Sequence, residues 1–112
     1  FLEIGSNVHI GGQSYLGCAG GIIIKNNVNI SQGVKIYSKI NDYLNGRKFN
    51  KTIKVPVKIF NEVIIGSNSV VIGKCKINTG ATVGALSFVK KDLKSWTIYA
   101  GNPVKMIKKR IR

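Results

Sequence analysis

The sequence predicts an all-β fold: a parallel β-solenoid of six-residue repeats, in a single domain that covers residues 1–112. Isoleucine and valine together supply 28 residues, whereas leucine supplies 5 and alanine 4, and this ratio favours strands over helices. Large apolar residues recur at every sixth position in three runs. The 13 glycines and 11 asparagines tolerate positive φ angles, so they supply turns at short intervals.

Twelve near-regular hexads make up most of the chain. Their first positions are Ile4, Ile10, Leu16, Ile24, Ile30, Ile36, Ile59, Ile65, Val71, Ile77, Val83 and Val89. A period of six does not fit an amphipathic helix, and an antiparallel sandwich does not hold such a register across interruptions. A short strand and a corner in each hexad do fit, with the large side chain inward and a Gly or Asn at the corner. Glycine often follows the first position directly, as at Gly5 and Gly66. Because no hexad can bury its apolar side alone, coils stacked about 4.8 Å apart have to supply the core.

Two interruptions and a distinct ending break the repeat. The register gains two residues between Leu16 and Ile24. Residues 41–56 are polar and basic and contain an Asn-Gly pair, which predicts a loop protruding from the solenoid wall. Near the end, residues 95–99 are expected as a last extended segment. Pro103 then suits the first position of a helix, so residues 103–112 are predicted to form a short basic amphipathic helix.

Charge and composition narrow the function. Lysine and arginine total 18 against 4 acidic residues, a net charge of +14. Such a charge favours an anionic partner: nucleic acid, anionic lipid, acidic polysaccharide or a phosphate-rich cofactor. A composition that is simply rich in lysine is the alternative explanation. One histidine and two cysteines exclude a zinc enzyme that needs several histidines, and they exclude a disulfide scaffold.

The same composition bears on location. No apolar run approaches the roughly 20 residues of a membrane span, and no secretory signal is visible. The two cysteines, Cys18 and Cys75, are expected to be reduced thiols. We therefore expect a cytoplasmic protein without an integral membrane segment.

The hexads, the protruding loop and the ending "VGALSFVKKDLKSWTIYAGNPVKMIKKR" resemble the hexapeptide-repeat acyltransferases, in particular the O-acetyltransferases of sugars and surface polysaccharides. The likeness covers essentially the whole chain. It implies a left-handed parallel β-helix of triangular cross-section, with three hexads in each coil. It also implies a homotrimer that binds acetyl-CoA, and no metal, in a groove between neighbouring prisms. The implied activity is acetylation of a sugar hydroxyl on a sugar, nucleotide sugar or polysaccharide, and nucleic acid is not an expected partner.

The resemblance also indicates where the chemistry takes place. In the family a loop histidine acts as the general base, but the matching position here is Asn41, and an amide has no useful basicity. Asp42, next to it, is one candidate for the base. His9, the only imidazole, is another, acting from an adjacent coil or another subunit. The alternatives are a plain turn at Asn41 and Asp42, and an outward His9 without a role.

The missing histidine leaves two further functions open. The amine of an amino sugar needs less help from a base than a hydroxyl does, so N-acetylation is one alternative. The other is a prism that has lost its chemistry and binds anionic glycan or nucleic acid. Tyr43 and Phe49 are the aromatic residues of the basic loop, and two rings give little support to nucleic-acid binding.

The cofactor site is better supported by the resemblance. The phosphates of CoA favour basic side chains and backbone N–H groups. The residues that match the family's CoA contacts are Ser67, Ala85, Lys90, Lys91, Lys105 and Lys108. Lys105 and Lys108 stand where the family commonly has arginines, so they would act as point charges and not as bidentate forks. For each of these lysines the alternative is a solvated surface.

Overall fold

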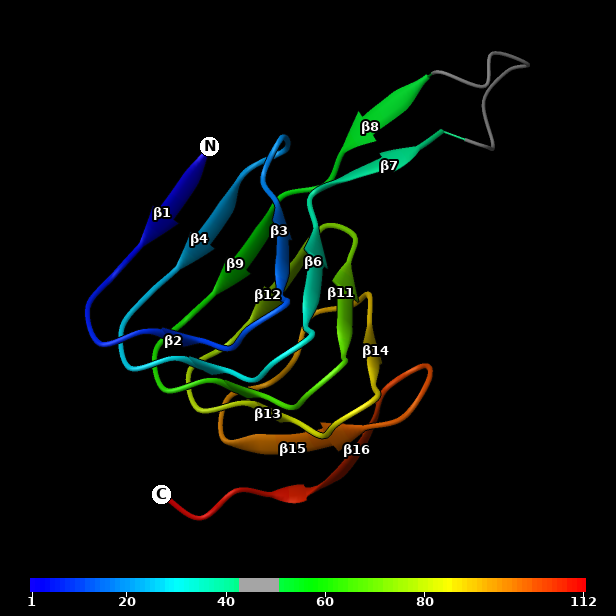
Figure 1. Ribbon diagram of the computed structural model, residues 1–112. Coiled ribbons are helices and arrows are strands. Elements are labelled where there is room, and N and C mark those ends of the chain that lie inside the picture. Colours follow the sequence, from blue (N-terminus) through cyan, green and yellow to red (C-terminus); the bar gives the residue numbers. More distant parts are fainter. Residues whose placement is uncertain (43–50) are drawn as a thin grey trace.

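Three parallel sheets form the walls of a triangular prism in the computed structural model, which describes residues 1–42 and 51–112 (Figure 1). Sheet A contains β1 (Leu2–Ile4), β4 (Ile22–Ile24), β9 (Val57–Ile59) and β12 (Cys75–Ile77). Sheet B contains β2 (His9–Ile10), β5 (Asn29–Ile30), β10 (Ile64–Ile65), β13 (Thr82–Val83), β15 (Thr97–Ala100) and β16 (Lys105–Lys109). Sheet C contains β3 (Tyr15–Gly17), β6 (Lys35–Tyr37), β11 (Val70–Ile72) and β14 (Phe88–Val89). The chain visits A, B and C in turn, so each coil adds one strand to every wall.

The pairing register confirms the hexad pattern. Ile24 lies opposite Ile59, and Ile59 lies opposite Ile77, so the long interruption does not disturb the ladder. The first positions of the hexads from Ile24 onward are at most 1% exposed. The second apolar positions, four residues later, are buried as well: Val28, Val34, Val63, Ser69, Cys75, Ala81 and Ser87. Most hexads therefore contribute two inward side chains, whereas Ile40, the second position of the hexad that starts at Ile36, lies half-buried in the hairpin. Stacking closes the core between coils.

Asn or Gly, the residues expected at the corners, occupies five of nine hexad corners with a positive φ angle, and Gln, Glu, Leu and Trp occupy the other four. Positive φ angles occur at the fourth position of the hexads: Asn7, Gln13, Asn27, Gly33, Glu62, Asn68, Gly80, Leu86 and Trp96. The glycines directly after the first position are required for another reason, which is lack of space for a side chain. A Cβ on Gly66 would lie 2.5 Å from the nitrogen of Ala85, so these glycines permit the close approach of neighbouring coils.

The expected loop begins and ends as a hairpin. Strands β7 (Lys39–Asn41) and β8 (Thr52–Lys54) pair antiparallel and project from the corner between sheets C and A (Figure 1). The N–H of Val55 donates to the carbonyl oxygen of Ser38 at 2.8 Å, which ties the base of the hairpin to the wall. Residues 43–50 of the expected loop, which include Tyr43 and Phe49, lie outside the described residues.

The expected C-terminal helix over residues 103–112 is wrong, and no helix occurs in the described parts of the chain. Residues 105–109 instead form β16, which pairs antiparallel with β15. An isolated helix of this length is marginal in water, whereas the free edge of β15 offers a row of unpaired backbone groups. Val104 is buried, and its N–H donates to the carbonyl oxygen of Phe88, which turns the chain back along that edge.

Candidate active site

The corner between sheets B and C brings Ser67 and Ala85 together. Both occupy the third position of their hexads in consecutive coils, and the N–H of Leu86 donates to the carbonyl oxygen of Ser67 at 2.9 Å. Ser67 is half-buried and Ala85 is exposed, and neither has a long side chain. An extended ligand can therefore approach the backbone closely along this corner. Leu86 adds apolar surface beside it, because it is 74% exposed.

Strand β16 places Lys105 and Lys108 on one face of sheet B. Lys105 lies opposite Ala100 and Lys108 opposite Ile98, with a register irregularity between Ile98 and Tyr99. Opposite residues of an antiparallel pair share a face, and a bulge lets residues three apart keep the same side. Tyr99 is buried in the core. Its neighbours Ile98 and Ala100 therefore face outward, and so do the two lysines.

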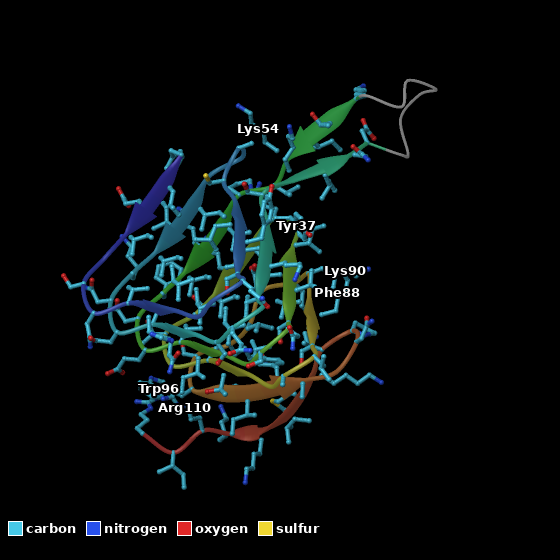
Figure 2. All side chains as sticks on the ribbon, in the orientation of Figure 1. Tyr37, Lys54, Phe88, Lys90, Trp96 and Arg110 are labelled. Carbon is cyan, nitrogen blue, oxygen red and sulfur yellow. The ribbon has the colours of Figure 1, made fainter. Side chains whose placement is uncertain are left out.

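The six predicted cofactor residues fall into two groups. A Cβ on Gly84 would lie 3.2 Å from the Cβ of Ala100, so the Lys105 end of β16 adjoins the corner of Ser67 and Ala85. Lys90 and Lys91 instead follow β14 at the corner between sheets C and A (Figure 2). Four of the six residues therefore lie along sheet B and its corner with sheet C. Lys90 and Lys91 are separated from these four by the width of sheet C.

The outer face of sheet C, between these two corners, carries apolar and aromatic residues, of which only Ile72 was expected there from the sequence. They flank the inward residue of each hexad: Tyr15, Tyr37, Val70, Ile72 and Phe88. The rings of Tyr15 and Tyr37 lie 5.5 Å apart between centroids. Together with Cys18 and Lys39 they border a hollow of about 350 Å³. These apolar and aromatic residues stand directly before or after the first positions of their hexads, so the sequence already contained the signal for them.

The hairpin holds Asn41 and Asp42 at the point where the described part of the hairpin ends. Asn41 is exposed and lies opposite Thr52. Asp42 is only 7% exposed, and its Oδ2 lies 3.7 Å from Nζ of Lys51. The N–H of Asp42 donates to the carbonyl oxygen of Lys51 at 2.8 Å. The carboxylate is therefore held inside the hairpin with an ammonium group beside it.

His9 is not part of the hairpin site within one chain. It is exposed on β2 and lies opposite Asn29 on the outer face of sheet B. The hairpin leaves from the corner between the other two sheets, and Figure 1 shows it on the far side of the prism from β2. A site that contains both His9 and Asp42 would need two copies of the chain.

A second hollow lies on the outer side of sheet A, and the sequence analysis did not anticipate it. It has a volume of about 440 Å³ and is lined by Pro56, Lys58, Lys74, Cys75, Lys76 and Asp92. Burial raises the pKa of the Cys75 thiol to about 12, and the Asp92 carboxylate adds to the shift. Cys75 belongs to the lining of this hollow although its side chain is buried, and the charges at the rim are mainly lysines.

Neither a metal-binding cluster of side chains nor a membrane-spanning helix is found in the part of the chain that the structure describes. Among residues 1–42 and 51–112, no cluster of three or more His, Cys, Asp or Glu side chains could hold a metal ion. In the same ranges, no helix is long and apolar enough to cross a bilayer.

Comparison with known proteins identifies the class. No family model matches the chain. It is 34% identical over 119 residues to a dTDP-4-amino-4,6-dideoxy-D-glucose acyltransferase of Escherichia coli, a match that covers 97% of this chain and 61% of the relative. It is 30% identical over 115 residues to the galactoside O-acetyltransferase of Escherichia coli K12, covering 96% of this chain and 57% of that protein.

Solved structures give the same result. The S-to-A variant of AntD, an N-acyltransferase from Bacillus cereus, was determined with dTDP-4-amino-4,6-dideoxyglucose and coenzyme A. It matches with a TM-score of 0.90 at 32% identity, over 99% of this chain and 64% of that one. A hexapeptide-repeat acetyltransferase from Vibrio cholerae matches with a TM-score of 0.91 at 25% identity, over 99% of this chain and 64% of that one.

The prism is thus a left-handed parallel β-helix, as the resemblance implied. Its hexads, its projecting hairpin and these relatives give the family: the chain belongs to the hexapeptide-repeat acyltransferases. It spans about three-fifths of the length of the curated relatives that it matches end to end.

Proposed function

We propose that this β-helix transfers an acetyl group from acetyl-CoA to a sugar hydroxyl, in the cytoplasm, as part of surface-polysaccharide modification. The observation that carries the proposal is the corner of Ser67 and Ala85, with Lys105 and Lys108 on an adjoining outward face. Small side chains there leave room for a pantetheine arm, and the two ammonium groups suit the phosphates of CoA. Related structures that contain coenzyme A support this ligand.

The remaining cofactor lysines fit a homotrimer. Lys90 and Lys91 lie across sheet C from the Ser67 corner, so they would contact the CoA bound mainly by a neighbouring prism. The apolar outer face of sheet C, with Tyr37 and Phe88, would then lie in the groove between two prisms. In such an assembly His9 of one copy can approach the hairpin of another.

The transfer step needs a base or an orienting group near the hairpin. The hydroxyl oxygen attacks the thioester carbonyl carbon, the carbon–sulfur bond breaks, and the hydroxyl proton passes to a base while CoA leaves as the thiolate. Asp42 is our first candidate, either as the base or as the group that orients the hydroxyl. Asn41 can donate a hydrogen bond to the acceptor, and His9 from another copy is the alternative base.

A second candidate function is N-acetylation of an amino sugar. It is favoured by the position of His9, which leaves the hairpin of the same chain without an imidazole. An unprotonated amine attacks a thioester with little help from a base, so this chemistry does not need one. The E. coli dTDP-4-amino-4,6-dideoxy-D-glucose acyltransferase, which is named for an amino sugar, and AntD, which is named as an N-acyltransferase, support the same candidate.

Two measurements test these proposals together. CoA at one hundred times its dissociation constant is expected to stabilise the folded protein by about 2.7 kcal/mol, measured as a shift of thermal unfolding. Release of free CoA thiol from acetyl-CoA is then followed with neutral sugars, acidic oligosaccharides, amino sugars and a dTDP-linked amino sugar. Transfer only to amines would replace the first candidate by the second. Stabilisation without transfer to any acceptor would indicate a lapsed enzyme, and no stabilisation would contradict both candidates.

A further inference from the structure

Two pairs of lysines lie directly opposite each other on neighbouring strands around the corner between sheets C and A. Lys39 lies opposite Lys54 in the hairpin, and Lys58 lies opposite Lys76 in sheet A. All four side chains are exposed. Like charges in opposite positions destabilise a sheet. Among the described residues, none of the four ammonium groups lies within 4.0 Å of a carboxylate oxygen. The ion pair found in this region joins Lys51 and Asp42 instead.

The second pair lies at the hollow of about 440 Å³ on sheet A. Pro56 directly precedes β9 in this wall, and its carbonyl oxygen accepts a hydrogen bond from the N–H of Cys75 at 3.3 Å. The hollow therefore begins where the hairpin rejoins the prism. Figure 2 shows Lys54 at this junction. Lys74 adds a third cation to the same rim.

The hollow contains one carboxylate, that of Asp92, and it already accepts a hydrogen bond from the protein. Oδ1 of Asp92 accepts a hydrogen bond from the backbone N–H of Lys76 at 2.8 Å. Three lysines against one aspartate leave the rim with a net positive charge. Together with the hairpin pair, the cations extend from the base of the hairpin along the wall over the two coils of β9 and β12.

We propose that this surface, formed by Lys39, Lys54, Lys58, Lys74 and Lys76, binds an acidic sugar chain that carries a carboxylate on successive sugars. The proposal rests on the proposed function and names the class of its acceptor. Lys58 and Lys76 repeat a cation in two consecutive coils, which are spaced about 4.8 Å apart along the prism axis, so an extended chain with regular carboxylates meets a lysine in each of them. A chain bound there leads to the base of the hairpin at Lys39 and Lys54, and Asn41 and Asp42 lie farther out, where the described part of the hairpin ends.

The composition of the hollow favours a glycan over a nucleic acid. Single-stranded nucleic acids are held by aromatic rings interleaved with cations, because the bases need stacking partners. The hollow is lined by lysine, proline, cysteine and aspartate side chains, without an aromatic ring. The tyrosine and phenylalanine rings of sheet C face another side of the prism.

The test is isothermal titration of the whole protein, without CoA, with a short oligogalacturonate and with its methyl ester, which has the same backbone and no charge. Binding of the acid form is expected to weaken steeply with salt, and the ester is expected not to bind. The variant K58Q/K76Q should bind the acid roughly fivefold or more weakly, since two exposed ion pairs are lost. It should keep the stabilisation by CoA. The control K105Q/K108Q removes the same charge and should show the reverse: unchanged glycan binding and weaker CoA binding.

Four results would overturn the proposal. Equal binding of the acid and the ester would show that charge is not recognised. Equal losses of glycan affinity in both double variants would reduce the effect to net charge. Tighter binding of single-stranded oligothymidylate, lost in K58Q/K76Q, would make the surface a nucleic-acid site. Binding of thymidine diphosphate as tight as the oligogalacturonate, lost in the same variant, would make it a diphosphate site. Each of these results leaves the CoA measurements, and with them the proposed function, to be judged separately.

Discussion

Gly80 and Trp96 occupy the same corner in consecutive coils, and their contact shows how tightly the coils stack. Gly80 has a φ of 77°, and an added Cβ would overlap the ring of Trp96. The ring in turn lies under the guanidinium groups of Arg110 and Arg112, each 5.2 Å from its centroid (Figure 2). Nη1 of Arg110 also donates to the carbonyl oxygen of Gly80 at 3.0 Å. This corner therefore joins the last coil to the C-terminal segment.

Substitution of Gly80 by alanine should destabilise the fold. Both the positive φ and the overlap with the Trp96 ring act against a side chain, and we expect a loss of about 1 to 3 kcal/mol in the free energy of unfolding. Urea denaturation measures it. Gly12→Ala is the matched control, because an added Cβ there has no neighbour within 4 Å. Equal losses in the two variants would contradict the packing explanation.

Cys75 should make stability fall at alkaline pH. Its folded pKa of about 12 lies above its ordinary value of 9.0, so the unfolded state loses the proton first. The stabilisation that the neutral thiol contributes is complete below about pH 9 and is lost as the pH rises towards 12. The difference in unfolding free energy between the parent and Cys75→Ala should therefore shrink above about pH 9. A difference that stays constant with pH would show that the thiol is not protected by burial.

Asp42 and His9 are distinguished by their effects on turnover. If Asp42 is the base, Asp42→Asn should lower kcat by about 10² to 10⁴ and leave the CoA-dependent shift of thermal unfolding unchanged. His9→Ala is the parallel variant, and its loss should be small. Initial rates with the best acceptor of the panel give the answer. Full activity in Asp42→Asn with a large loss in His9→Ala would reverse the assignment and would require a second copy of the chain at each site.

Strand β16 is the element in which local and tertiary preferences diverge. Its sequence has the spacing of an amphipathic helix, yet all five residues are exposed, and all except Ile107 pair with β15. A lone helix gains little there, whereas pairing satisfies the backbone groups of an edge strand. The bulge then aligns Lys105 with Lys108, which a regular strand would direct to opposite faces.

Charge reversal at Lys105 and Lys108 should weaken CoA binding without unfolding the protein. The loss of contacts between ammonium and phosphate groups is expected to cost about 1 to 3 kcal/mol, measured by titration with CoA. Reversal at Lys74 and Lys76 changes the net charge by the same amount at the hollow of sheet A and is the control. A similar loss in both variants would show an effect of net charge alone.

The whole prism presents apolar surface that a second copy can cover. Ile64 and Ile72 are only partly buried on the outer faces of sheets B and C, and Tyr15 and Leu86 are more exposed. Covering such surface stabilises an assembly by about 25 cal/mol for each Å². The lysines proposed to bind CoA lie in two separate places, on sheet B and at the corner between sheets C and A, which is a second reason to expect contact between prisms.

We therefore predict a homotrimer in solution. Light scattering at micromolar concentration should give three times the chain mass of 12.2 kDa. Introduction of a charge at Ile72, on the outer face of sheet C, should lower that mass, and the same change at the exposed Asn68 should not. A mass equal to that of one chain in the unmodified protein would contradict the prediction.

The spacing of isoleucine and valine was sufficient to predict a parallel β-solenoid. A large inward residue at every sixth position dictates a strand and a corner in each hexad, and the two interruptions are tolerated because they leave the ladder as loops. The triangular cross-section followed from the resemblance. Ile24 and Ile59 are thus neighbours in sheet A although the hairpin segment separates them in sequence. The family, and through it the hand of the helix, followed from the resemblance of the same hexads.

The tertiary structure alone decided what lies side by side. The sequence could not place Lys39 opposite Lys54 or Lys58 opposite Lys76, because the width of the hairpin and the exact coil stacking set those pairs. It could not exclude a C-terminal helix, because the edge of β15 exists only after the coils have stacked. The sequence also could not locate His9 relative to the hairpin, whereas the fold places it on sheet B, away from the corner where the hairpin leaves the prism. Periodicity is a property of the chain, whereas a site is a property of the surfaces that stacking brings together.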